Sequence, residues 1–247
     1  MIRLSLLIAC LFFTLLLQGQ SHSEVANLKT GSIPMEPDVL LGLWGVNEVA
    51  VGNEMMTPVA RWFEYQPGNV ITSGNGWIQN SYSTYEFDPQ AGSFLVYNSG
   101  IPDEYGPFTI KVADDVMTWT RSEDGMTVKV SLSRIDEKPR GPWDNFLGFW
   151  KLESATPEGA NLESNTAWLL IRWDHRVVLF DAEGRRKGFG IWQIDGHNPW
   201  LTVVHDSGSR EHWTIGFEST QMTWQGRNAQ NGISFQFKKV SGVGSEE

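Results

Sequence analysis

The residues best suited to chemistry are the histidines of the second half and the acids beside them. Asp174-His175 and His205-Asp206 each offer an imidazole and a carboxylate, two common metal ligands. Neither an H-x-H nor an H-E-x-x-H pattern, which would place two imidazoles on one face, occurs in the chain. A G-x-S-x-G nucleophile turn does not occur either. We therefore expect surface histidines, no metal site, no catalytic residue and no cofactor, and we interpret the protein as a non-enzyme.

Tryptophans with a polar neighbour on the same strand face are better candidates for a binding site. Trp62 and Glu64 lie two residues apart and share a face, and so do Trp168 and Arg172 in the corresponding later segment. A polar group beside an aromatic wall can orient a ligand inside a cavity. The alternative is that this face points to solvent. An inward orientation of the two tryptophans favours a cavity, and an outward one favours an exposed platform.

Two further aromatic residues are secondary candidates for ligand binding. Tyr85 lies in a long apolar-polar alternating segment, and Trp192 lies in its counterpart. Both could equally be shell or interface residues. Met117 and Trp119 share one strand parity with other bulky residues, and we expect them to fill the core rather than contact a ligand.

The chain repeats itself, and the repeat defines its organisation. An offset of 106 places residues 41–44 on residues 147–150 and Trp62 on Trp168. An offset of 105 places Met117-Thr118-Trp119 on Met222-Thr223-Trp224. Such aromatic matches in phase over about a hundred residues indicate an internal duplication.

Each repeat has the pattern of short β-strands. Alternating runs are separated by turn signals such as Pro67-Gly68-Asn69 and Glu123-Asp124-Gly125. In the first repeat the predicted strands lie near residues 41–50, 59–65, 69–73, 76–87, 93–98, 106–112, 116–121 and 126–134. Eight strands with short turns predict an all-β protein with two tandem small antiparallel up-and-down barrels, which leave no open edge. A pair of β-sandwiches is the alternative.

A glycine, a tryptophan and a distant cation form a recurring set in both repeats. Gly42 and Trp44 open the first strand of repeat one, and Val128, Val130, Leu132 and Arg134 share one face of its last strand. Gly148, Trp150 and Lys239 occupy the same places in repeat two. A cation at the end of an apolar face needs a partner, and the tryptophan can receive it through a cation–π contact of about 0.5–2 kcal/mol.

This pairing resembles the kernel of the lipocalin family, in which a Gly-x-Trp opens the first strand and an Arg or Lys near the end of the last strand packs on the Trp. The resemblance covers both repeats and implies binding of a small apolar molecule inside a barrel. Gly42, Trp44, Arg134, Gly148, Trp150 and Lys239 would then be structural. Each repeat is shorter than a secreted animal lipocalin, and we predict neither a flanking C-terminal helix nor a disulfide.

The N-terminus resembles a secretory signal peptide. Arg3 precedes an apolar run of 14 residues from Leu4 to Leu17, and small residues follow at Ser21 and Ser23. The run is shorter than the roughly 20 residues of a spanning helix. Cys10 within Leu7-Ile8-Ala9-Cys10 resembles a lipidation site, so a lipid-anchored protein is the alternative to a secreted or periplasmic one.

The predicted organisation is a signal peptide over 1–23, an extended leader over 24–37, lipocalin-like repeats over 38–135 and 144–240, a linker over 136–143 and a tail over 241–247. The formal net charge is −10. Because this charge repels phosphates, nucleic acid and anionic membrane surfaces are poor partners. We expect no membrane span in the mature chain, and the oligomeric state is left open.

Three functions fit these patterns. The first is a lipocalin-like protein that binds a small apolar molecule. The second is a carbohydrate- or surface-binding module using exposed aromatic residues, such as Phe94 and Trp200 on the face opposite Leu95 and Leu201. The third is a purely structural or protein-interaction pair of barrels.

Overall fold

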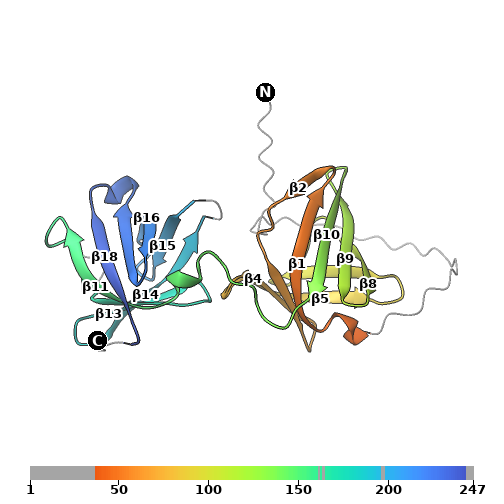
Figure 1. Cartoon of the computed structure of the whole chain (residues 1–247), viewed down its shortest axis with the longest axis horizontal. Helices are drawn as coiled ribbons and strands as arrows, with labels where there is room; N and C mark the ends of the chain where they lie inside the picture. The colour runs from red at the N-terminus through yellow and green to blue at the C-terminus, as the bar shows by residue number, and fades with distance from the viewer. Residues whose placement is uncertain (1–36, 161, 163–164, 196–197, 243–247) are drawn as a thin grey trace, which may run out of the picture. The chain divides into compact units, whose positions relative to one another are not determined.

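The computed structural model describes residues 37–160, 162, 165–195 and 198–242. The predicted signal peptide with Cys10, the leader up to residue 36 and the tail beyond residue 242 lie outside the described residues. The described chain is almost entirely β-structure, in which neighbouring strands pair antiparallel (Figure 1). In this part of the chain no helix is both long and apolar enough to cross a membrane.

The first repeat closes into an eight-stranded barrel. Its strands are β1 (Gly42–Val51), β3 (Trp62–Gln66), β4 (Val70–Asn75), β5 (Ile78–Asp88), β6 (Ser93–Asn98), β8 (Phe108–Ala113), β9 (Val116–Glu123) and β10 (Met126–Arg134). They follow one another around the sheet, and β10 pairs back to β1. Two short strands, β2 (Glu54–Met56) and β7 (Ile101–Pro102), pair with β1 and β6 outside this ring. The barrel prediction is therefore confirmed, and the sandwich alternative is wrong.

The second repeat forms a closed barrel of the same order. Its strands are β11 (Gly148–Thr156), β12 (Trp168–Ile171), β13 (Arg176–Phe180), β14 (Arg186–Ile194), β15 (Trp200–His205), β16 (Arg210–Glu218), β17 (Gln221–Gly226) and β18 (Ser234–Val240). Strand β18 pairs back to β11. Two tandem eight-stranded antiparallel barrels are consistent with a lipocalin-like fold.

The compact units of the chain do not coincide fully with the repeats. The first unit contains residues 63–72 and 82–136 together with the chain up to Pro58. The second unit contains Val59–Trp62, Ser73–Ser81 and the chain from Glu137 onward. In that unit Asp144 accepts hydrogen bonds from the amides of Trp77 (2.7 Å) and Gly141 (2.8 Å). The tip between β4 and β5 is thus part of the second unit.

One end of the first barrel is closed by a short 3₁₀ helix, η1 (Pro37–Leu40). Trp44 is fully buried, and its indole N–H donates to the carbonyl of Leu40 (2.8 Å). Arg134 lies opposite Trp44 in the β1–β10 register, with its guanidinium carbon 4.3 Å from the ring centroid. The same guanidinium donates to the carbonyls of Leu41 (2.6 Å) and Val39 (2.9 Å). Arg134 therefore joins the last strand to the turn that precedes the first.

The second barrel repeats this closure with a lysine. Helix η2 (Asp144–Phe146) precedes β11, and the Trp150 indole N–H donates to the carbonyl of Phe146 (2.9 Å). Lys239 lies opposite Trp150, with its Nζ 5.3 Å from the ring centroid and 3.1 Å from the carbonyl oxygen of Asn145. Burial lowers the pKa of Lys239. One ammonium contact replaces the two guanidinium contacts of the first barrel.

Gly42 shows why the motif requires glycine beside the tryptophan. Its φ is +111°, a conformation that side-chain-bearing residues rarely adopt. A Cβ atom at this position would lie 2.8 Å from Nη1 of Arg134. Gly148 has a φ of +122° at the same place in the second barrel. The glycine thus permits both the turn into the strand and the close approach of the cation.

Substituting the two cations should affect stability to different degrees. We expect Arg134→Met to lower the free energy of unfolding by about 1–3 kcal/mol, because it removes a close cation–π contact and two charge-assisted hydrogen bonds. Lys239→Met should lower it by about 1 kcal/mol or less, since its ring contact is longer and only one carbonyl is involved. Urea denaturation followed by circular dichroism measures both. Equal losses would contradict the assignment of the larger role to Arg134.

Candidate functional site

The structure places Trp62 and Glu64 on the outer face of strand β3. Their neighbours Phe63 and Tyr65 point inward, where Phe63 packs 4.8 Å from Trp119 and Tyr65 belongs to the buried core. Because side chains alternate along a strand, Trp62 and Glu64 lie on the opposite face. Trp62 is nevertheless fully buried, with its indole N–H donating to the carbonyl of Gly76 (2.8 Å).

Trp168 and Arg172 are likewise outside the interior of the second barrel. Leu169 and Ile171 enter the core, so Trp168 lies on the other face of β12. Trp168 is only 6% exposed, and the Lys151 Nζ lies 5.3 Å from its ring centroid. Arg172 pairs with Asp174 at 2.9 Å. Trp62 and Trp168 are therefore outward but covered, which fits neither a cavity wall nor an open platform.

The other two predicted residues lie inside, in different barrels. Tyr85 is buried in the first barrel beside Tyr65 and Phe94, with ring centroids 5.4 Å from each. Trp192 is buried in the second barrel, where it packs edge-on against Phe146 at 5.1 Å. The six predicted residues therefore do not form one site, and only Tyr85 and Trp192 face a barrel interior.

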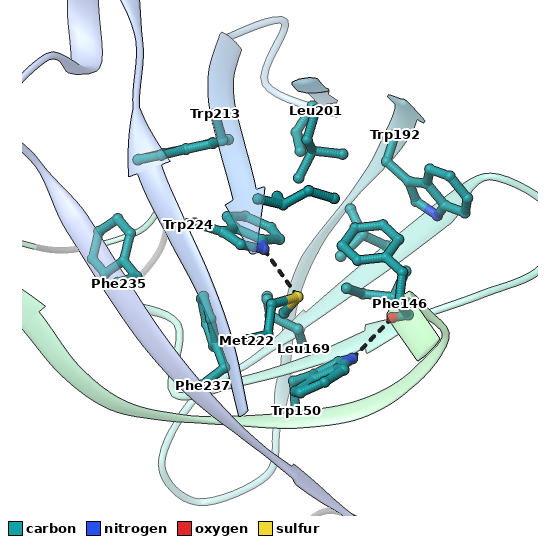
Figure 2. Packing of buried hydrophobic residues seen from close by; sticks show 14 of the residues in the cluster. Phe146, Trp150, Leu169, Trp192, Leu201, Trp213, Met222, Trp224, Phe235 and Phe237 are labelled. Carbon is teal, nitrogen blue, oxygen red and sulfur yellow. Dashed lines mark hydrogen bonds between the residues drawn. The ribbon is translucent and has the colours of Figure 1, made fainter. Parts of the chain in front are cut away.

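The interior of the second barrel is packed with aromatic side chains (Figure 2). The buried indoles donate as follows: Trp150 to the Phe146 carbonyl, Trp192 to the carbonyls of Arg172 and Arg176, Trp213 to the Glu211 carboxylate and Trp224 to Sδ of Met222. This pattern is that of a filled core, in which buried polar groups have partners.

The interior of the first barrel also contains a continuous aromatic cluster. Phe94 lies at its centre, 5.8 Å from Tyr65 and 5.4 Å from Trp119 between ring centroids. Phe108 extends the cluster, 5.4 Å from Trp119. Tyr65 and Trp119 bring a hydroxyl and an indole N–H into these surroundings, and they expose only 2% and 4% of their surface.

Two polar atoms of this cluster lack a hydrogen-bond partner in the described part of the chain. They are the Tyr65 hydroxyl and Nε1 of Trp119, and both are buried. Leaving such a group unpaired in a protein interior costs about 1–3 kcal/mol. Most buried polar groups in proteins have a hydrogen-bond partner. Two buried groups without one in the same core therefore indicate a place where a further polar group would be stabilised.

Tyr65 and Trp119 belong to one buried cluster, in which each ring lies beside Phe94. Burial raises the pKa of the Tyr65 hydroxyl well above its ordinary value, Tyr85 raises it further, and a hydrogen-bonding influence of Trp119 partly opposes them. The hydroxyl is therefore neutral at physiological pH. Burial and then the charge of Asp38 raise the pKa of Tyr85. A neutral hydroxyl and an indole N–H thus lie within one apolar cluster.

The second barrel lacks this pair at the corresponding positions. Trp224 corresponds to Trp119, but its indole donates to Met222 at 3.2 Å. Ile171 corresponds to Tyr65 and is buried in the core without a polar group. Sequence reasoning assigned Trp119 to the core and missed Tyr65. The only signal in the sequence was that the first repeat has a tyrosine where the second repeat has an isoleucine.

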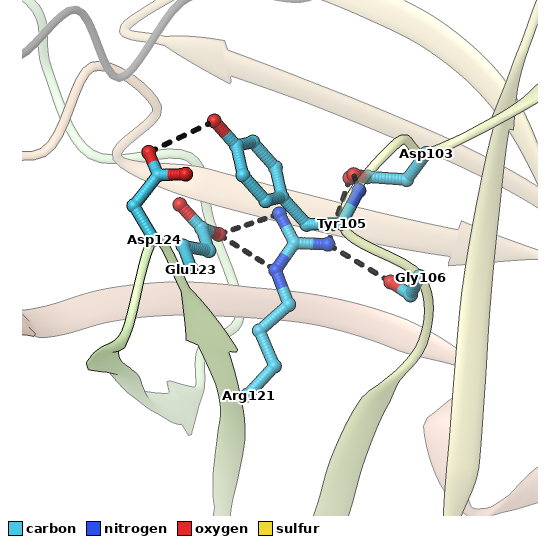
Figure 3. A network of polar contacts seen from close by, with 6 residues as sticks. All are labelled: Asp103, Tyr105, Gly106, Arg121, Glu123 and Asp124. Atoms are coloured by element: carbon cyan, nitrogen blue, oxygen red, sulfur yellow. Dashed lines mark hydrogen bonds and ion pairs between the residues drawn. The ribbon is translucent and has the colours of Figure 1, made fainter.

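A polar network surrounds Arg121 in the first unit (Figure 3). The Arg121 guanidinium stacks 3.9 Å from the Phe108 centroid and pairs with Asp103 at 3.0 Å and Glu123 at 2.6 Å. It also donates to the carbonyl of Gly106 (3.0 Å). The cation is therefore balanced by two carboxylates, and its side chain is 9% exposed.

The histidines and carboxylates of the described residues do not gather into a metal site. In that part of the chain, no group of three His, Cys, Asp or Glu side chains is arranged to hold a metal ion. His205 is buried and lies 3.2 Å from Glu211, which in turn accepts the indole N–H of Trp213. His205 therefore belongs to the packing of the second barrel, and the prediction of a surface histidine is wrong for this residue.

Comparison with protein-family models, with curated proteins and with solved structures found no match to this chain.

Proposed function

We propose that this protein binds a small, mostly apolar molecule inside its first barrel, as a lipocalin-like binding protein. The observation that carries the proposal is the pair of unpaired buried polar atoms, the Tyr65 hydroxyl and Nε1 of Trp119, within an aromatic cluster. Apolar walls with a few convergent polar groups are typical of small-molecule sites. The tandem barrels and their Gly-x-Trp kernels support the lipocalin-like assignment.

The second barrel has a structural role in this proposal. Its core tryptophans have acceptors for their indole N–H groups, and its interior is lined by large aromatic side chains (Figure 2). Among the described residues, the buried indoles of this core therefore offer no free donor to a ligand. The asymmetry between the repeats therefore supports binding in the first barrel.

The proposal also includes secretion. Arg3, the apolar run to Leu17 and the small residues near Ser23 support export, with a secreted or periplasmic protein as the outcome. A lipid anchor at Cys10 is the alternative. Intact mass of the protein from its native compartment distinguishes cleavage near Ser23 from lipidation at Cys10.

Native mass spectrometry of the full mature chain tests binding. We expect a reproducible extra mass that solvent extraction removes and that a panel of small apolar compounds restores. Tyr65→Phe and Trp119→Phe should each reduce the bound fraction, because each removes one of the two polar groups. Trp224→Phe is the matched control, since it removes the corresponding indole of the second barrel, and it should leave binding unchanged.

A clean mass that no compound of the panel shifts would overturn the proposal. In that case internal water would be the partner of the two buried groups, since water commonly satisfies such atoms in protein interiors. Equal losses from Trp119→Phe and Trp224→Phe would instead place binding outside the first barrel.

A carbohydrate-binding role is a second candidate, favoured by the exposed tryptophans of the second unit. Trp77 and Trp173 are 62% and 48% exposed, and the Gln79 amide donates to the Trp173 carbonyl (3.2 Å), so their segments lie side by side. Trp200 is also exposed, but the Arg227 guanidinium lies 4.0 Å from its ring centroid. Adding soluble oligosaccharides to the same panel tests this candidate.

The predicted aromatic row of Phe94 and Trp200 is wrong for one member. Phe94 is fully buried in the first barrel core, whereas Trp200 is 41% exposed. The two strands are therefore shifted by one residue relative to the sequence match, and such a shift turns every side chain to the opposite face.

A further inference from the structure

We infer that the first barrel selects a neutral molecule whose buried polar atom is a hydrogen-bond acceptor, such as the oxygen of a ketone or an ester. This inference rests on the proposed function and specifies the chemical class of its ligand. It concerns the Tyr65 hydroxyl and the Trp119 indole N–H, which are both buried in the aromatic cluster of the barrel interior.

The hydrogen-bonding capacities of the two groups require an acceptor. An indole N–H can only donate, whereas a phenol hydroxyl donates one hydrogen bond and accepts others. If both groups point to the ligand, they present two donors to it. If the indole instead donates to the hydroxyl oxygen of Tyr65, the hydroxyl hydrogen still lacks an acceptor. In both arrangements the missing partner is an acceptor.

The surrounding charges exclude an anionic ligand. One cation that contacts a ring of this cluster is Arg134, which lies over Trp44 and pairs with Asp115 at 3.6 Å. Arg121 reaches the cluster at Phe108, but Asp103 and Glu123 already balance its charge. A carboxylate buried beside Tyr65 would therefore lack a counter-ion, and burying an unpaired charge is strongly unfavourable.

The other end of the cluster supports the same conclusion. The carboxylate of Asp38 acts on Tyr85, whose ring contacts Tyr65 at 5.4 Å between centroids. This negative charge would repel an anion that enters beside Tyr85. A cation is disfavoured for a different reason, because its polar end would meet two hydrogen-bond donors. A neutral acceptor avoids both conflicts.

The apolar body of the ligand is specified by the rest of the interior. Phe94, Ile110 and Met117 are buried around the two polar groups, with at most 2% of their surface exposed. Aromatic rings favour offset or edge-on contact with other rings, and a methionine thioether also packs well against them. A small aromatic ketone combines such a body with a carbonyl acceptor.

Three probes of nearly the same shape test the inference on the full mature chain. Acetophenone carries a carbonyl, α-methylstyrene replaces its oxygen by a CH₂ group, and benzoate replaces the acetyl group by a carboxylate. Titrations at neutral pH are followed by the indole N–H signals in ¹H–¹⁵N correlation spectra. Loss of one signal in Trp119→Phe identifies Trp119, and Trp224→Phe provides the control signal from the second barrel.

We expect acetophenone to bind roughly tenfold more tightly than α-methylstyrene, as one to two additional hydrogen bonds would give. Its binding should shift the Trp119 indole signal to higher proton frequency and leave the Trp224 signal unchanged. Benzoate should bind more weakly than both. Tyr65→Phe should remove most of the advantage of the ketone and leave the affinity for α-methylstyrene nearly unchanged.

The outcomes separate this inference from the proposed function. Equal binding of acetophenone and α-methylstyrene, with shifts confined to the first barrel, would overturn the acceptor requirement and support apolar binding alone. Tighter binding of benzoate would overturn the neutral class. Failure of all three probes, together with a clean native mass, would overturn the proposed function and the inference with it.

Discussion

Replacing Trp150 by alanine is expected to lower the free energy of unfolding of the second barrel by about 3–5 kcal/mol, the usual cost of truncating a large core side chain. Trp150 is 1% exposed and packs within the aromatic core, with Phe217 at 6.3 Å between centroids. Its truncation also removes the indole N–H that donates a hydrogen bond to the Phe146 carbonyl at 2.9 Å. The cavity and the loss of the turn that closes the barrel both lower the free energy of unfolding.

Trp44→Ala should have an effect of similar size on the first barrel. Trp44 is fully buried, donates to Leu40 and lies under Arg134. Because the chain holds many tryptophans, amide hydrogen exchange by mass spectrometry is the appropriate measurement, since it reports each barrel separately. Each substitution should accelerate exchange mainly in its own repeat.

Trp173→Ala is the matched control for this prediction. Trp173 is 48% exposed in the second unit, so its truncation removes little buried surface and should change stability by about 0.5 kcal/mol or less. If Trp150→Ala or Trp44→Ala left the free energy of unfolding of its barrel nearly unchanged, the barrel-closing role assigned to these residues would be contradicted.

Replacing Arg121 by leucine is expected to destabilise the first barrel by about 3 kcal/mol, because it leaves Asp103 buried without its cation. The Asp103 side chain is only 7% exposed, and Arg121 is its ion-pair partner at 3.0 Å. The substitution also removes the stacking on Phe108 and the hydrogen bond to the Gly106 carbonyl. Urea denaturation followed by circular dichroism measures the loss.

A second substitution separates charge from packing in this network. Asp103→Asn combined with Arg121→Leu should recover part of the stability, since the uncompensated charge is removed. Arg185→Leu is the surface control, because Arg185 is 72% exposed although it also pairs with two carboxylates, Asp181 and Glu183. It should change stability little, as exposed pairs are screened by water. A comparable loss at both arginines would contradict the importance of burial.

The strand pattern was predictable because local periodicity carries it. Val128, Val130 and Leu132 alternate with polar residues in the sequence, and the same three are buried in β10. The turns between strands could be recognised from glycine, proline and asparagine. The duplication then identified which strands correspond, and the closure of each sheet followed from eight strands joined by short turns.

The faces of individual side chains were less predictable. Sequence matching aligned Phe94 with Trp200, yet Phe94 is buried and Trp200 is exposed. A displacement of one residue between the repeats does not show when their sequences are aligned with a gap. It nevertheless turns each side chain to the opposite face of its strand. Trp62 and Trp168 show a second limit, because both lie outside their barrel interiors and are still buried. Part of the cover of Trp62 comes from a segment distant in sequence, because Nζ of Lys138 lies 3.9 Å from its ring centroid.

The sequence by itself determined the two all-β repeats, their strand number and the tryptophan and cation that occupy opposite ends of each repeat, because these features arise from period-two alternation and from identity between halves. Only the tertiary structure decided where a ligand could be recognised. Tyr65 and Trp119 are 54 residues apart in sequence, and they enter one core only after the barrel closes. Whether a buried hydroxyl or indole has a partner depends on every chain segment around it, so no local pattern could reveal that these two do not.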